Sequence, residues 1–155
     1  MLPATRRRVP LNTAEEVNQR IRQRTERNIM HCIQAGPDAI DRRLEVLDQE
    51  WDIERCLETM APTFSLLGLA LGVTRNRKWL LVPAFVQTFF LQHALQGWCP
   101  PVPVLRRLGF RTMDEINEER YALKALRGDF KKLSRKKKEQ TGDGRVVAAL
   151  AAVRS

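Results

Sequence analysis

The feature that most constrains this chain is a run of 55 residues without aspartate or glutamate, from Thr59 to Met113. All 18 acidic residues of the protein lie outside it. Inside it, two apolar stretches, Met60–Val73 and Trp79–Trp98, are joined by the short basic turn Thr74–Lys78. A charged side chain costs roughly 2.5–3.5 kcal/mol at the centre of a membrane helix, so the absence of carboxylates is typical of segments that enter lipid. The window therefore predicts a membrane-inserted helical hairpin.

The two apolar stretches differ in how well they match a bilayer. Trp79–Trp98 has 20 residues, which corresponds to about 30 Å of helix. Met60–Val73 has 14, and a start at Leu57 gives 17, the lower limit for a span. Segments this short also suit core helices of a soluble protein, or a hairpin that enters the bilayer only part-way. In the membrane interpretation, interfacial anchors are expected from the tryptophans at the ends of the second stretch and from the basic turn: Trp79, Trp98, Arg75, Arg77 and Lys78.

Helical patterns flank the window, so the expected fold class is all-α. Gly36-Pro37-Asp38 has the chemistry of one helix end followed by a helix start, and the second of these helices is expected to run directly into the window. Residues 99–103 are rich in proline and are predicted to be non-helical, whereas Thr112–Glu115 has the pattern of a capping box at a helix start. The expected order is a disordered basic arm (1–12), a cytoplasmic helical hairpin (13–58), a transmembrane hairpin with a proline-rich turn (59–110), an amphipathic basic helix (111–138) and a disordered tail (139–155).

The net charge of +9 is unevenly distributed. Residues 1–58 carry a net charge of −1, whereas residues 59–110 and 111–155 each carry +5. A basic C-terminal half favours an anionic partner, and beside an apolar hairpin membrane lipid is the simplest one. Specific nucleic-acid binding is not expected, because no aromatic platform accompanies the basic residues. The expected lipid-binding cluster consists of Lys131, Lys132, Arg135, Lys136, Lys137 and Lys138.

Basic residues also give an orientation. Six of them lie close to the outer ends of the two apolar stretches, against three in the turn, which favours both termini in the cytoplasm. The N-terminal arginines are not followed by an apolar run, so no cleavable secretory signal is expected.

The sequence shows no recognisable catalytic or cofactor-binding pattern. Its three cysteines have no CxxC spacing, which gives no basis for a disulfide framework or a zinc site. There is no glycine-rich phosphate loop, no His-Glu metal helix and no Ser/His/Asp set that spacing would single out. We therefore predict neither an enzyme nor a bound metal or cofactor.

Several residues in the window follow a recognisable order. Glu54-Arg55 precede the first apolar stretch with Gly68-Leu69-Ala70-Leu71-Gly72, and the second ends in Gly97-Trp98-Cys99-Pro100, followed by Leu108-Gly109. This order, over residues 52–112, resembles the YgaP-like inner-membrane domain, a bacterial two-helix module sometimes attached to a rhodanese sulfurtransferase domain. The resemblance implies an integral membrane protein that self-associates through its hairpin, with a link to sulfur or thiocyanate handling. Residues 1–51 lack the strand–helix alternation of a rhodanese domain, so sulfurtransferase activity is not expected.

Three groups of residues in the window are candidate sites. The small side chains of Ser65, Gly68 and Gly72 predict close helix packing, either in a dimer or within the hairpin itself. The polar residues Gln92, His93 and Gln96 predict either a proton or small-anion path or ordinary interhelical hydrogen bonds near the headgroups. Cys99 is either a reactive thiol, with positive potential supplied by Arg106 and Arg107, or a small structural residue at a turn.

Three functions remain open at this point. The first is a membrane scaffold or assembly module that binds lipids, forms a homodimer and recruits a separate protein partner. The second is a soluble all-α interaction protein with a buried apolar hairpin. The third is a sulfur-relay accessory that accepts persulfide at Cys99.

Overall fold

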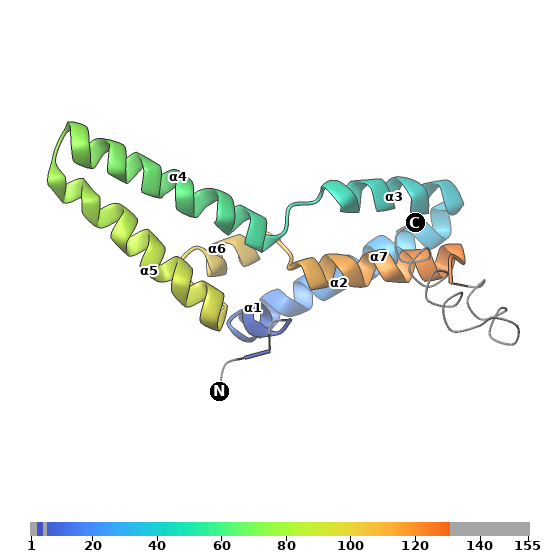
Figure 1. The fold of residues 1–155 in the computed structure, drawn as a ribbon. Coiled ribbons are helices and arrows are strands. Elements are labelled where there is room, and N and C mark those ends of the chain that lie inside the picture. The colour runs from blue at the N-terminus through green and yellow to red at the C-terminus, as the bar shows by residue number, and fades with distance from the viewer. Residues whose placement is uncertain (1–2, 5, 131–155) are drawn as a thin grey trace, which may run out of the picture. The chain divides into compact units, whose positions relative to one another are not determined.

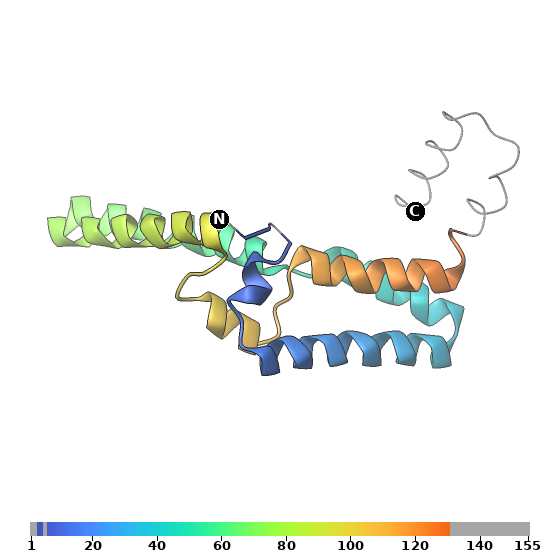
Figure 2. The same cartoon turned by 90° about the horizontal axis from the view of Figure 1, so that it is seen from below.

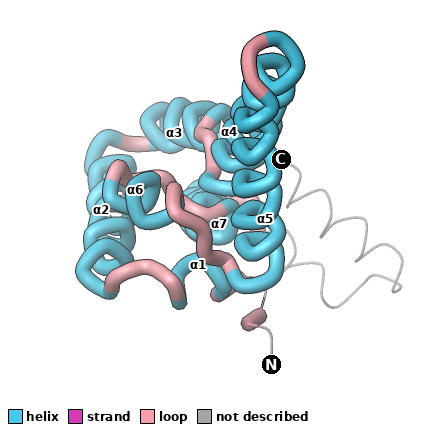
Figure 3. Tube along the Cα trace, turned by 90° about the vertical axis from the view of Figure 1, so that its left-hand side faces the viewer, coloured by secondary structure: helices cyan, strands magenta, loops and turns pink. Residues whose placement is uncertain are grey.

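The computed structural model describes residues 3, 4 and 6–130, and over these residues it contains helices and no strand (Figure 3). The predicted all-α class is confirmed. In chain order the elements are α1 (Arg8–Leu11), α2 (Glu15–Ala35), α3 (Pro37–Gln49), α4 (Ile53–Thr74), the 3₁₀ helix η1 (Arg77–Leu80), α5 (Leu81–Gln96), α6 (Val102–Arg107) and α7 (Met113–Arg127).

The chain divides into two compact units. Within the described residues, the first contains those up to Arg24 and those from Glu50 to Ile116, and the second contains residues 25–49 and 117–130. α2 and α7 each contribute residues to both units, so neither unit is one continuous stretch of the chain.

The α4–α5 hairpin dominates the first unit. Figure 1 shows the two helices as an antiparallel pair joined through η1, and in the view from below one lies behind the other (Figure 2). Glycines on α4 permit this close approach. A Cβ atom at Gly68 would lie 2.6 Å from Cδ of Pro83, and one at Gly72 would lie 2.5 Å from Cδ2 of Leu80. The close packing of the hairpin therefore depends on these two positions having no side chain.

α4 begins after a break in the chain, not as a continuation of α3. Asp52 has extended backbone and its carboxylate accepts a hydrogen bond of 2.7 Å from the N–H of Arg55, which caps the new helix. The expectation of one helix running into the apolar window is therefore wrong. A side-chain cap satisfies amide donors that the first turn leaves open, so an aspartate at this position starts a helix.

α5 is shorter than the 20-residue helix expected from sequence and has 16 residues. Its first residues form η1 instead, and it ends at Gly97, where φ is +79° and the N–H donates to the carbonyl of His93 at 2.7 Å. Trp98 thus lies outside the helix, with its ring centroid 6.4 Å from that of Phe89. Trp79 lies in η1 and is 45% exposed.

Two segments expected to lack helix are helical in part. α1 forms part of the predicted disordered arm, and its Val9 is buried in a cluster with Ile53, Leu57 and Cys99. Of the proline-rich residues 99–103, the first three are non-helical as predicted, whereas Val102 and Pro103 belong to the first turn of α6. Proline is tolerated in a first helical turn because the N–H that it lacks has no intrahelical acceptor there, and Pro101 occupies the N-cap of α6.

The start of α7 confirms the predicted capping box. The N–H of Thr112 donates to Glu115 at 2.8 Å, and the N–H of Glu115 donates to the Thr112 hydroxyl at 3.3 Å. Arg106 donates to both carboxylate oxygens of Glu115, at 2.6 and 2.8 Å, and its side chain is 0% exposed. This buried pair links α6 to α7.

In the second unit, Leu44 and Leu47 of α3 and Leu123 of α7 are buried. Glu119, which is fully buried, accepts hydrogen bonds from Arg43 at 2.7 and 3.2 Å. Gly36 adopts a φ of +91° before α3, so the predicted glycine–proline helix boundary is confirmed. The predicted lipid-binding cluster 131–138 and the tail 139–155 lie outside the described residues.

Candidate functional site

The hairpin carries outward-facing apolar side chains over most of its length. We call residues 59–91 the apolar arm. Its charged residues are Arg75, Arg77 and Lys78, and all three lie at the turn. Val73, at the end of α4, is 83% exposed. The other large exposed apolar residues of the arm are Phe64, Leu66, Leu67, Leu69, Trp79, Leu80, Leu81, Phe85 and Leu91.

Among the described residues, one helical stretch is long and apolar enough to cross a membrane by length and composition, and its apolar window falls within α4. Only 33% of that window is buried. The core helix of a soluble protein is mostly buried, whereas most of this window is exposed within the chain.

The small residues predicted to pack helices face α5 and η1 within the same chain. Gly68 and Gly72 meet side chains of these elements, and the hydroxyl of Ser65 accepts a hydrogen bond of 2.9 Å from Gln87. The sequence left open whether this face packs within the hairpin or in a dimer. The first arrangement is the one found here, so any dimer contact has to use another surface.

At the base of the hairpin, three charged or titratable side chains form a connected cluster. Glu54 on α4 accepts a hydrogen bond of 2.8 Å from Arg8 on α1, and its other oxygen lies 2.8 Å from Nε2 of His93 on α5. Arg8 also donates to the carbonyl of Ala94 at 2.9 Å. His93 is 1% exposed. The cluster ties α1, α4 and α5 together.

The other predicted polar residues do not join this cluster. Gln92 is half-buried and Gln96 is exposed. The backbone carbonyl of Gln96 accepts a hydrogen bond of 2.8 Å from the side-chain amide of Asn12. Sequence reasoning missed Arg8 and Glu54. One signal for Glu54 was available: it precedes Ala61 by seven residues, and Gly68 by fourteen, so all three occupy the same face of α4. A carboxylate on a packing face requires a buried partner.

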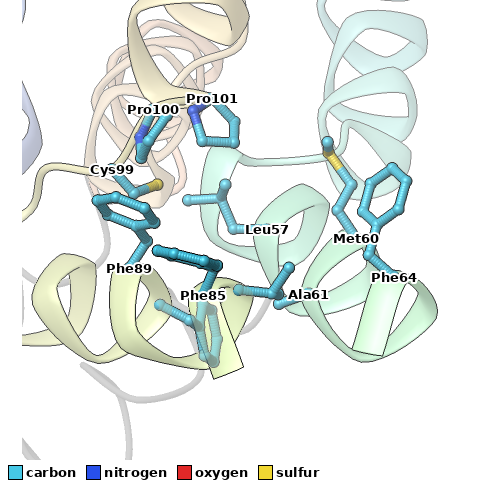
Figure 4. A pocket seen from close by; sticks show the side chains of 11 residues that line it. Leu57, Met60, Ala61, Phe64, Phe85, Phe89, Cys99, Pro100 and Pro101 are labelled. Carbon is cyan, nitrogen blue, oxygen red and sulfur yellow. The ribbon is translucent and has the colours of Figure 1, made fainter. Parts of the chain in front are cut away.

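A cavity of about 230 Å³ is lined by residues of α4, of α5 and of the turn that follows α5. Figure 4 shows Leu57 and Ala61 of α4 facing Phe85 and Phe89 of α5, with the Pro100–Pro101 turn at one end. The lining also includes Met60, Phe64, Val86, Phe90 and Cys99. Because Phe64 is 47% and Phe85 is 63% exposed, the cavity is continuous with the exposed apolar surface of the arm. Its lining is almost purely hydrocarbon, apart from sulfur.

Cys99 lines the cavity and is 3% exposed. The Nδ1 atom of His93 is buried and has no hydrogen-bond partner among the described residues. Arg106 is engaged by Glu115, Asn18 and the carbonyl of Phe110, so it does not supply the positive charge that we expected beside the thiol.

The other two cysteines are also buried. Burial raises the pKa of the Cys32 thiol, so this residue is poorly suited to nucleophilic chemistry. No group of three or more histidine, cysteine or acidic residues is positioned to hold a metal ion within residues 6–130.

No family model, curated protein or solved structure matches this chain. The resemblance to the YgaP-like domain therefore stays a prediction.

Proposed function

We propose that the apolar arm inserts into a lipid bilayer and anchors the chain, so that the protein acts as a small membrane scaffold whose helical part outside lipid presents a platform for assembly. The observation that carries this proposal is the outward exposure of the arm. A soluble protein rarely leaves a contiguous surface of this kind uncovered, and hydrocarbon is the surrounding that it suits.

The arm is short for a bilayer, and the three charged residues at its tip decide how deeply it inserts. Thr59–Thr74 comprises 16 residues, about 24 Å of helix against a hydrocarbon thickness of about 30 Å. Stopping inside the hydrocarbon would place three cations in lipid, at roughly 2.5–3.5 kcal/mol each. Thinning the bilayer locally costs only fractions of a kcal/mol per Å. The balance favours a tip that reaches the far headgroups.

Both ends of the hairpin then lie on one side of the membrane. The charge distribution in the sequence favours the cytoplasmic side of an inner membrane for both termini. The Arg8–Glu54–His93 cluster lies at the near boundary, where α1 shields it and supplies its counter-charge. A half-buried carboxylate with two partners is tolerated there, whereas one in the arm would have none.

Alkaline carbonate extraction of membranes from expressing cells tests the proposal. We expect the full chain to remain in the membrane pellet. Leu66→Asp, at a position 66% exposed on the arm, should move a substantial fraction into the supernatant. The matched control is Val46→Asp, 53% exposed on α3, which should leave the distribution unchanged. Release of the unmodified chain as a monodisperse particle without detergent would refute insertion and favour the soluble interaction protein.

The depth of insertion has its own test. Trp51→Phe together with Trp98→Phe leaves Trp79, in η1 at the tip, as the sole tryptophan. Full crossing predicts that quenchers at headgroup depth reduce its fluorescence more than quenchers at the bilayer centre. Stronger quenching from the centre would show that the tip stops part-way.

A further inference from the structure

The short helix α6 is attached to the base of the hairpin by one of its faces. Val102, Leu105 and Arg106 on this face are buried. Val102 and Leu105 belong to a buried cluster with Ile53 and Leu57 of α4, so α6 packs against the start of α4, immediately before the arm begins (Figure 1). When the arm is inserted as proposed above, α6 therefore lies at the near boundary of the bilayer.

The opposite face of α6 is exposed and mostly apolar. Val104, Arg107 and Leu108 follow the spacing i, i+3 and i+4, which places them on the same side of the helix. Val104 is 58% and Leu108 is 70% exposed, and Arg107 is exposed between them. A helix face that meets water is usually polar, whereas apolar side chains combined with a cation are typical of helices that lie among lipid headgroups.

Arg24 on α2 adds a second cation beside this face. Asn18 of α2 accepts a hydrogen bond of 3.0 Å from the buried Arg106, and this contact fixes α2 against α6. Further along α2, Nη1 of Arg24 lies 3.5 Å from the carbonyl oxygen of Gly109, the second residue after Arg107. Two arginine side chains therefore border the exposed apolar residues of α6.

The fold leaves the charge of these two arginines uncompensated. Neither Arg24 nor Arg107 forms an ion pair with a carboxylate in the part of the chain that the structure describes. The carboxylate of Glu115, which contacts α6, is taken by the buried Arg106. A guanidinium matches a phosphate group in charge and in geometry, because it presents paired N–H donors to two oxygens. The neighbouring apolar side chains favour a phosphate that is attached to hydrocarbon.

We propose that the surface made by Arg24, Val104, Arg107 and Leu108, which we call the α6 surface, binds the headgroup of an anionic phospholipid. The arginines bind the phosphate, and the two apolar side chains enter the boundary between headgroups and acyl chains. This inference rests on the proposed membrane anchoring and deepens it. The arm fixes the protein in the bilayer, and the α6 surface holds the helices outside lipid against one leaflet.

The experiment measures lipid binding at this surface with the purified full chain in non-ionic detergent micelles. Val104→Cys carries a bimane fluorophore, and the three native cysteines are buried, so they react little. The probe is phosphatidylglycerol with a nitroxide quencher on the acyl chain near the headgroup, and phosphatidylcholine with the same quencher is the neutral control. Phosphatidylglycerol should quench the fluorophore at much lower mole fractions than phosphatidylcholine. The same fluorophore at Val46→Cys, 53% exposed on α3, should show no such preference.

Variants separate the two arginines from the general charge of the protein. A basic residue near an anionic surface strengthens binding by about a factor of five. Arg24→Gln together with Arg107→Gln should therefore weaken phosphatidylglycerol binding roughly 30-fold. Arg27→Gln together with Arg42→Gln is the matched control, because it removes the same charge from exposed positions on α2 and α3 and should have little effect.

Two further measurements distinguish a lipid from a free anion. Leu108→Ser should weaken phosphatidylglycerol binding, and inorganic phosphate at constant ionic strength should not displace the lipid. The proposal is overturned if the two lipids quench equally, if both pairs of arginine substitutions have the same effect, or if inorganic phosphate competes. Because this assay uses micelles and carbonate extraction uses membranes, anchoring by the arm and lipid binding at the α6 surface can each fail separately.

Discussion

The buried pair of Arg106 and Glu115 allows a quantitative prediction. Arg106 donates two hydrogen bonds to this carboxylate and one each to Asn18 and the carbonyl of Phe110, and its side chain is 0% exposed. Glu115→Gln keeps the shape of the side chain but removes its charge. The guanidinium then remains buried without a counter-charge, while its neighbours stay in place.

Breaking a buried ion pair by removing one partner costs about 3–5 kcal/mol. Glutamine still accepts through its carbonyl oxygen and can keep the cap on Thr112, so we expect a value near the lower end, about 3 kcal/mol. That corresponds to an increase of roughly 150-fold in the unfolding equilibrium constant, at about 1.4 kcal/mol for each factor of ten. The loss is a large fraction of the about 5–15 kcal/mol that holds a typical domain folded.

Urea unfolding in a mild detergent, followed by far-ultraviolet circular dichroism, measures this change. Glu118→Gln is the matched control, because Glu118 is exposed on the same helix and should change stability by less than about 0.5 kcal/mol. Arg106→Met combined with Glu115→Gln should be less destabilising than the sum of the two single changes, since no unpaired guanidinium remains. A loss below about 1 kcal/mol for Glu115→Gln, or additivity in the double variant, would refute the reasoning.

Three further predictions follow from described contacts. Burial acts to raise the pKa of Glu115, but the hydrogen bonds and charge of Arg106 outweigh burial and hold this pKa below its ordinary value of 4.5. The stability that this pair contributes is therefore fully present above pH 4.5, and it is lost as the pH falls through the lower pKa of the folded state. Urea titrations across acidic pH should show this loss in the unmodified chain and a flatter profile for Glu115→Gln. Gly68→Leu should destabilise the hairpin by about 1–3 kcal/mol, because the added side chain overpacks the contact with α5. Ala70→Leu, at an exposed position, is the control and should leave the stability nearly unchanged. The rate of proteolysis of the arm in micelles measures both effects. Asp52→Ala removes the cap of α4 and should cost about 1 kcal/mol in the same urea assay.

Local chemistry was sufficient to predict several helix boundaries. Gly36 followed by Pro37 marks a helix boundary because glycine readily adopts the positive φ that ends one helix, and proline has the fixed φ that suits the first turn of the next. Each of these is a property of a single residue. The capping box between Thr112 and Glu115 spans only four residues, so its hydrogen bonds follow from spacing alone. Such features do not depend on contacts with distant parts of the chain.

The features that sequence reasoning missed depend on long-range contacts or on weak propensities. Arg8 lies 46 residues from Glu54 and 86 from Ala94, and no local pattern connects them. The segment around Arg8 was interpreted as a disordered arm because it is short and basic, and burial of Val9 against α4 overrides that tendency. In α6, the prolines were taken as helix breakers although they stand where a helix tolerates them.

The distribution of charge along the hairpin reflects one physical rule applied in two surroundings. At the base, a carboxylate is present because Arg8 and His93 provide partners for it within the fold. Along the arm no carboxylate occurs. A charge can be buried only where the protein provides its counter-charge. Glu54 therefore lies where other helices of the chain supply its partners, whereas the exposed apolar side chains beyond Thr59 belong to the part of the hairpin that we propose enters lipid.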